Sequence, residues 1–172
     1  MKVKTSLILL CAICLAAVVT NAQDANPQTL ELMSQGSALF LQGDFKAAIV
    51  PYQKALNLEK AKPTLDKTMW RVLVDQLGMA YGISGDLKKA KETFDYGLEK
   101  DPKYPMFHYN MACTYGEMND PDKAIVYLRQ AFEYKANMIK GEKLPNPFTD
   151  SSFKRFMNND KFVSALTEIM NR

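Results

Sequence analysis

Few residues of this chain could carry out catalysis, and the rarest is its single histidine. With only His108 available, a two-histidine mechanism and a metal site built from several histidines are both excluded. The acidic pair Asp120 and Asp122 stands at an expected helix start, where the helix dipole favours acidic side chains without any catalytic role. Glycine-rich phosphate-binding motifs and a Gly-x-Ser-x-Gly motif are absent from the sequence. The sequence therefore predicts no enzyme activity, no cofactor and no metal.

Cys113 is the other candidate for chemistry. A thiol becomes a nucleophile when a neighbouring base or cation favours its thiolate form. The residues one or two helical turns away, Met106, Tyr109 and Gly116, supply no such group. We therefore expect Cys113 to be a small apolar packing residue, with a reactive or intermolecular thiol as the alternative.

The first 22 residues have the pattern of a secretory signal peptide. Lys2 and Lys4 are followed by an apolar run over residues 7–19, which is too short to span a membrane, and small residues allow cleavage after Ala22. A retained membrane anchor is the alternative. The residues before Cys14 match a lipoprotein pattern poorly, so a lipid anchor is not expected. The sequence thus predicts an exported chain, periplasmic or secreted, and no other stretch could span a membrane.

Removal of residues 1–22 would change both the charge and the cysteine content of the chain. The net charge would fall from +3 to +1 with the loss of Lys2 and Lys4, which gives no indication of nucleic-acid binding. Cys113 would be the only cysteine left, so an internal disulfide is impossible. Since 47% of the chain is hydrophobic and 24% is charged, we expect a globular domain stabilised by packing.

A short helix-stop and helix-start signal occurs three times along the chain. Each copy pairs a residue suited to the left-handed conformation with an aspartate suited to cap the next helix. The spacings are 42 and 34 residues, and a period near 34 is typical of helical repeat proteins. The three copies are Gly43-Asp44, Gly85-Asp86 and Asn119-Asp120.

Small residues recur on both sides of these turns, where two antiparallel helices could approach closely. Those before the turn are Gly36, Gly78 and Ala112, and those after it are Ala48, Ala90 and Ala124. Larger residues accompany them: Leu39, Tyr81 and Tyr115 before the turn, and Tyr52, Phe94 and Leu128 after it.

This pattern resembles the tetratricopeptide repeat, and residues 71–104 show it best, although Val74 stands at the place of the usual tryptophan. The copies are placed at residues 29–62, 71–104 and 105–138, after an N-terminal segment 23–28. The resemblance implies an all-α fold, an α–α superhelix or right-handed solenoid of three helical hairpins. Residues 139–172 would form a loop and C-terminal capping helices, which cover the last repeat.

Two regions depart from a strict repeat. In the insert 63–70, Pro63 ends one helix and Thr64 is expected to cap a longer next helix, whose packing face Trp70 would extend. In the tail, Asp150 or Ser151 could begin a short helix, and Asn159 or Asp160 the last one. The last helix has an apolar stripe formed by Phe162, Leu166, Ile169 and Met170.

The resemblance also implies a concave groove for a protein partner, lined by the first helix of each repeat. Its predicted lining is mostly apolar and rich in methionine, and it lacks the residues that clamp a peptide carboxylate in chaperone-binding relatives. Such a surface suits an apolar peptide or helix. The predicted residues are Leu30, Met33, Ser37, Phe40, Leu41, Val72, Asp75, Met79, Ile83, Met106, Tyr109, Cys113 and Glu117.

Two functions follow from this predicted groove. The first is a non-enzymatic scaffold or adaptor of the bacterial cell envelope, which binds a protein or peptide partner. The second is a structural or self-assembling subunit, a possible homo-oligomer, whose groove is filled by its own terminus or by a second copy.

Overall fold

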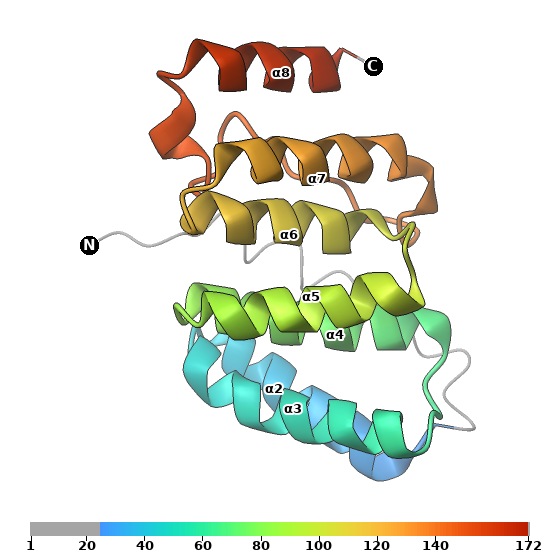
Figure 1. Cartoon of the computed structure of the whole chain (residues 1–172). Helices are drawn as coiled ribbons and strands as arrows, with labels where there is room; N and C mark the ends of the chain where they lie inside the picture. The colour runs from blue at the N-terminus through green and yellow to red at the C-terminus, as the bar shows by residue number, and fades with distance from the viewer. Residues whose placement is uncertain (1–24, 172) are drawn as a thin grey trace. The chain divides into compact units, whose positions relative to one another are not determined.

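The computed structural model describes residues 25–171 and shows seven α-helices, two short 3-10 helices and no strand in that part of the chain (Figure 1). The predicted signal peptide, residues 1–22, lies outside the described residues. The α-helices are α2 (Pro27–Leu41), α3 (Phe45–Ala61), α4 (Lys67–Ile83), α5 (Leu87–Lys100), α6 (Pro105–Glu117), α7 (Pro121–Glu133) and α8 (Asp160–Met170). The 3-10 helices are η2 (Lys135–Asn137) and η3 (Lys154–Phe156). The helices divide between a first unit with α2 to α4 and a second unit with α5 to α8.

The three repeated turns are confirmed. Gly43, Gly85 and Asn119 have φ values of +82°, +89° and +62°, in the left-handed region that such helix ends require. After each of them an aspartate side chain accepts a hydrogen bond from a backbone N–H three residues later, at 3.0 Å, 3.1 Å and 3.0 Å for Asp44, Asp86 and Asp120. The local sequence therefore fixes where one helix ends and where the next begins.

The first unit is built around the close approach of α2 and α3. Gly36 faces the ring of Tyr52, and Ala48 and Ala55 of α3 are fully buried. The third helix, α4, contributes a wide buried face, which includes Leu73 and Leu77. The small residues predicted to let the helices approach do so between α2 and α3.

The linker between α3 and α4 corrects one prediction. Asp66, not Thr64, caps α4, and its side chain accepts a hydrogen bond from the N–H of Met69 at 2.8 Å. Thr64 is held by Glu59, a buried carboxylate that accepts hydrogen bonds from the Thr64 N–H at 2.8 Å and the Thr64 hydroxyl at 2.7 Å. A buried carboxylate needs such donors, so Thr64 satisfies Glu59 and leaves the cap to Asp66.

The longer first helix predicted for this repeat is confirmed, since α4 has 17 residues and α6 has 13. Trp70 lies on α4 as expected but is only half-buried. Its neighbour Met69 is 9% exposed and belongs to the core.

In the second unit, α5, α6 and α7 form the core and α8 packs on α7. Phe94, Phe107 and Leu128 are at most 1% exposed. The Phe107 ring lies against Gly97, where an added Cβ would stand 2.8 Å from it. Helix α5 therefore approaches α6 at a residue without a side chain.

The C-terminal helix agrees with the sequence except at its last turn. Asn159 caps α8, and Phe162, Leu166 and Ile169 are buried. Met170 was predicted to share this stripe, but it is 39% exposed. One residue past Ile169, it lies about 100° further round the helix and faces away from α7.

Candidate functional site

The predicted groove residues of α2 and α4 belong to the first unit, and most of them are buried. Those no more than 9% exposed are Met33, Ser37, Phe40, Val72 and Asp75. Leu30, Met79 and Ile83 are half-buried, and Leu41 is 45% exposed. The accessible apolar surface of this part of the predicted groove is therefore confined to Leu30, Leu41, Met79 and Ile83.

Two of the buried residues have clear partners inside the unit. The Ser37 hydroxyl contacts the Tyr52 hydroxyl at 3.1 Å and donates to the Gln76 side-chain oxygen at 3.2 Å. The Phe40 ring packs edge-on against Phe45 of α3, with 4.9 Å between ring centroids. Because these side chains already have partners inside the unit, contacts with them would add little binding energy for a protein partner.

Three of the predicted residues of α6, Tyr109, Cys113 and Glu117, contact the chain's own C-terminal tail. Residues 150–156, which we call the covering segment, lie against the α6 residues Tyr109 and Cys113. The Tyr109 hydroxyl donates to the Asp150 carboxylate at 3.0 Å, and the Cys113 thiol lies 3.8 Å from the same oxygen. Tyr109 is 1% exposed, Met106 is 8% exposed, and Cys113 and Glu117 are half-buried.

The surroundings of Cys113 make it a poor nucleophile. Burial of the thiol and the nearby Asp150 carboxylate raise the pKa of Cys113 well above its ordinary value. Burial also raises the pKa of the Tyr109 hydroxyl, with further contributions from Cys113 and Asp150. Both groups are therefore protonated at neutral pH, which favours a packing role for Cys113.

His108 also has a structural environment. It is 5% exposed, and its Nε2–H donates to the carbonyl of Pro102 at 2.7 Å. Because a carbonyl only accepts, this bond fixes the proton of the neutral ring on Nε2. Burial lowers the pKa of His108, although the Pro102 carbonyl and the Glu133 carboxylate act in the opposite direction.

We expect the stability of the protein to fall as His108 becomes protonated. Because its folded-state pKa lies below its ordinary value of 6.5, the unfolded chain binds the proton first, and stability increases with pH in this range. The contribution of His108 is complete above the unfolded-state pKa and is lost as the pH falls through the lowered folded-state pKa. Urea unfolding at several pH values between 7.5 and 5 measures this slope.

The matched variant is His108→Gln, which keeps a donor near Pro102 but does not titrate. Its stability should change less over this range, since the chain has no other histidine and most carboxyl groups titrate at lower pH. An equal slope in both proteins would contradict this assignment.

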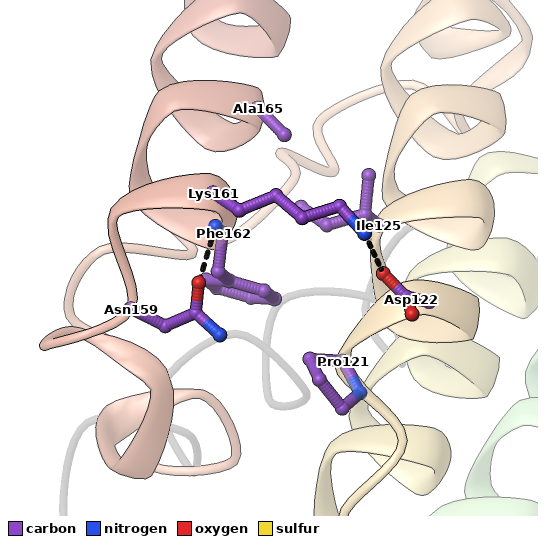
Figure 2. A pocket seen from close by; sticks show the side chains of 7 residues that line it. All are labelled: Pro121, Asp122, Ile125, Asn159, Lys161, Phe162 and Ala165. Atoms are coloured by element: carbon purple, nitrogen blue, oxygen red, sulfur yellow. Dashed lines mark hydrogen bonds and ion pairs between the residues drawn. The ribbon is translucent and has the colours of Figure 1, made fainter.

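A small hollow between α7 and α8 was not predicted from the sequence. It is lined by Pro121, Asp122, Ile125, Asn159, Lys161, Phe162 and Ala165 (Figure 2). At its rim, Lys161 and Asp122 form an ion pair at 2.8 Å, and both side chains are highly exposed. The hollow offers a few apolar atoms and one solvent-screened pair, so it gives no basis for specific binding or catalysis.

Sequence reasoning missed the covering segment as part of the candidate site. The tail was expected to pack somewhere, but nothing in the local pattern indicated which helix it would meet. The combination of acidic, aromatic and basic side chains in Asp150, Phe153 and Arg155 was the one available signal. These three residues contact α6, together with the backbone of Ser152.

A membrane-spanning helix and a cluster of metal-ligating side chains are both absent from residues 25–171. No helix there is both long enough and apolar enough to cross a membrane. The same residues contain no cluster of three or more His, Cys, Asp or Glu side chains suited to hold a metal ion.

Comparison with family models gives one match. Residues 93–126 match the family described as tetratricopeptide repeat. The matched stretch runs from α5 through α6 into α7, so it begins in the second helix of one predicted repeat and ends in that of the next. No curated protein matches the sequence.

Comparison with solved structures establishes the fold. The chain resembles the Sgt2 TPR domain from Aspergillus fumigatus, with a TM-score of 0.58 and 20% identity, over 85% of this chain and 79% of that one. It also resembles the type III secretion translocator chaperone SycD from Yersinia enterocolitica, in a structure described as an alternative dimer. There the TM-score is 0.58 and the identity 18%, over 87% of this chain and 96% of that one. The predicted all-α fold, a solenoid of tetratricopeptide-type helical hairpins, is thus confirmed. The family match and the fold together support a tetratricopeptide-repeat protein.

Proposed function

We propose that this chain is a non-enzymatic adaptor of the bacterial cell envelope that binds an apolar peptide or helix of a protein partner. The observation that carries the proposal is the shared fold, which covers 87% of this chain in the comparison with the SycD chaperone. That protein is described as a chaperone of a secretion translocator, which is a protein-binding role. Because a fold alone does not fix a function, the accessible side chains must supply the rest of the argument.

The first unit offers the accessible part of the predicted groove. Met79 and Ile83 are half-buried and stand four residues apart on α4, and therefore on one face of the helix. Leu30 and Leu41 of α2 are also partly accessible. Apolar side chains that include a flexible methionine can adapt to an apolar partner, and we assign the partner contact to these residues.

The cellular location is part of the proposal. It rests on the signal-peptide pattern of residues 1–22, with cleavage expected after Ala22. The intact mass of the chain isolated from its native host, with an affinity tag at its C-terminus, reports whether this cleavage occurs. An uncleaved chain in the cytoplasm would overturn the envelope assignment.

The binding test is affinity capture from an envelope extract of the native host, with bound proteins identified by mass spectrometry. The bait is the tagged chain, compared with a Met79→Glu, Ile83→Glu variant. The control is Val126→Glu, because Val126 is 54% exposed on α7 in the second unit. A partner retained by the control and reduced at least about tenfold by the double variant supports binding at α4.

The second candidate function is that of a structural subunit whose predicted groove is filled by its own terminus or by a second copy. The covering segment favours it, because it already contacts Tyr109 and Cys113, two of the predicted groove residues of α6. In that case no partner would depend on Met79 and Ile83. Light scattering would then show either a monomer closed by its own tail or an oligomer disrupted by the same double variant.

A further inference from the structure

The covering segment is held on α6 by a carboxylate. Asp150 accepts a hydrogen bond from the Tyr109 hydroxyl at 3.0 Å, and the Cys113 thiol lies 3.8 Å from the same oxygen. Tyr109 and Cys113 stand four residues apart, on one face of α6. This face therefore presents two donors to one acidic side chain.

The next contact of the covering segment requires a glycine. An added Cβ at Gly116 would stand 2.7 Å from the carbonyl oxygen of Ser152 and 3.2 Å from the ring of Phe153. The first distance is too short for a Cβ atom and the second is tight, so a side chain at this position would displace the Ser152 backbone. The Phe153 ring, which is fully buried, packs edge-on against Tyr109 with 6.3 Å between centroids.

The contact ends with a basic residue. Arg155 pairs with Glu117 in the last turn of α6 at 3.1 Å, and both side chains are partly exposed. Along α6, Tyr109 and Cys113 meet the carboxylate of the covering segment. Gly116 meets its backbone and ring, and Glu117 meets its guanidinium. The order of these contacts along the covering segment therefore follows their order along α6.

The covering segment holds its shape with short-range bonds of its own. The N–H of Phe153 donates to the Asp150 carbonyl at 3.2 Å, and the N–H of Phe156 donates to the Phe153 carbonyl at 2.9 Å. These bonds lie within the segment, and its rings also pack against Phe162 of α8. A separate peptide with the same residues carries the groups that form these bonds.

We propose that the covering segment is an internal ligand of α6. The α6 face recognises an acidic residue, an aromatic residue three positions later and a basic residue two positions after that. A protein partner with the order Asp-x-x-Phe-x-Arg binds this face in place of the segment. The proposal goes beyond the proposed function, because it concerns α6 and not the α2 and α4 residues assigned above. It rests on that function only for the existence of a natural partner, and the recognition itself can be tested without one.

The tethered segment has a strong advantage over any free competitor. Because it belongs to the same chain, its contact with α6 is intramolecular and does not depend on protein concentration. Phe153 also contacts Phe162 of α8, with 6.0 Å between ring centroids, and this contact helps to keep the segment in place. In the intact chain the face is therefore closed, and a free peptide should bind well only after the segment has been weakened.

The test uses a fluorescent peptide with the sequence of residues 148–157 and the full chain, with binding followed by fluorescence anisotropy. We expect the peptide to bind a Phe153→Ala chain at least about tenfold more tightly than the unchanged chain. A peptide in which the position of Asp150 is alanine should bind at least about tenfold more weakly, because the Tyr109 hydroxyl loses its acceptor. Gly116→Leu, added to the Phe153→Ala chain, should abolish binding of the peptide, since the leucine side chain fills the space of the Ser152 carbonyl.

Equal peptide binding by the unchanged and the Phe153→Ala chains would overturn the proposal, as would binding that is indifferent to Gly116→Leu. Circular dichroism shows whether Phe153→Ala is folded. If it is not, Arg155→Glu weakens the segment by repulsion from Glu117, keeps the buried ring, and should give a smaller increase in the same direction. Peptide binding without any partner in the capture experiment would refute the adaptor and leave this recognition intact. A captured partner without peptide binding would support the adaptor and refute the recognition at α6.

Discussion

Replacement of Phe107 by alanine is expected to lower the free energy of unfolding by about 3–5 kcal/mol, as for other fully buried aromatic side chains. The Phe107 side chain is fully buried and packs edge-on against Tyr104, with 4.8 Å between ring centroids. On its other side lies Gly97, which has no side chain to fill the space that the ring would leave. We therefore expect a cavity that the surroundings cannot close. Urea unfolding followed by far-UV circular dichroism measures the loss.

Two further variants show whether the loss comes from this packing. Phe148→Ala removes a ring that is 39% exposed and should cost less than about 1 kcal/mol, since little buried area is lost. Gly97→Ala places a methyl group 2.8 Å from the Phe107 ring and should destabilise the unchanged chain, but much less in the Phe107→Ala background, where the space is free. A Phe107→Ala loss below about 1 kcal/mol, or two costs that simply add, would show that the α5–α6 contact tolerates change.

The repeated turns could be predicted because their causes lie within a few residues. A left-handed residue, an aspartate cap and, in one copy, a proline at the first helical position each act on the nearest backbone groups. The structure confirms these features at Gly43, Gly85 and Asn119 and at the aspartate that follows each. The all-α fold follows from these signals and from small residues at helical spacing.

The linker before α4 shows where local reasoning fails. Thr64 and Asp66 are both good caps by type, and the sequence alone could not rank them. Glu59, on the preceding helix, decides between them by binding the Thr64 N–H and hydroxyl. The demand of a buried carboxylate for donors outweighs the preference of one residue for a cap position.

The predicted groove depends on contacts between residues that lie even further apart in the sequence. Its residues were assigned from repeat positions, which indicate a face of the first helix but not what covers that face. Ser37 faces Tyr52 and Gln76, while Tyr109 lies under Asp150, 41 residues away in sequence. Such contacts between distant residues depend on how the tail folds back, and no periodic pattern encodes that. Binding of a partner at these positions stays a prediction.

The second large effect is expected at Gly36, where alanine should lower the free energy of unfolding by about 1–3 kcal/mol, the usual cost of an overpacked core. A Cβ there would stand 2.6 Å from two ring atoms of Tyr52, much closer than carbon atoms approach without repulsion. The ring cannot easily retreat, because it is fully buried and its hydroxyl is hydrogen-bonded to Ser37 and Gln76. Alanine favours a helix by about 1 kcal/mol over glycine, and we expect the steric cost to exceed this gain.

Urea unfolding tests this balance with two companions of Gly36→Ala. Ser34→Ala, at an exposed position of the same helix, should change stability by less than about 0.5 kcal/mol. Tyr52→Phe removes the hydroxyl that anchors the ring, so Gly36→Ala should cost less in that background than in the unchanged chain. If Gly36→Ala were neutral or stabilising, helix propensity would outweigh packing here, and the approach of α2 to α3 would not depend on the missing side chain. If the cost were the same in both backgrounds, the ring would be held by its buried neighbours rather than by its hydroxyl group.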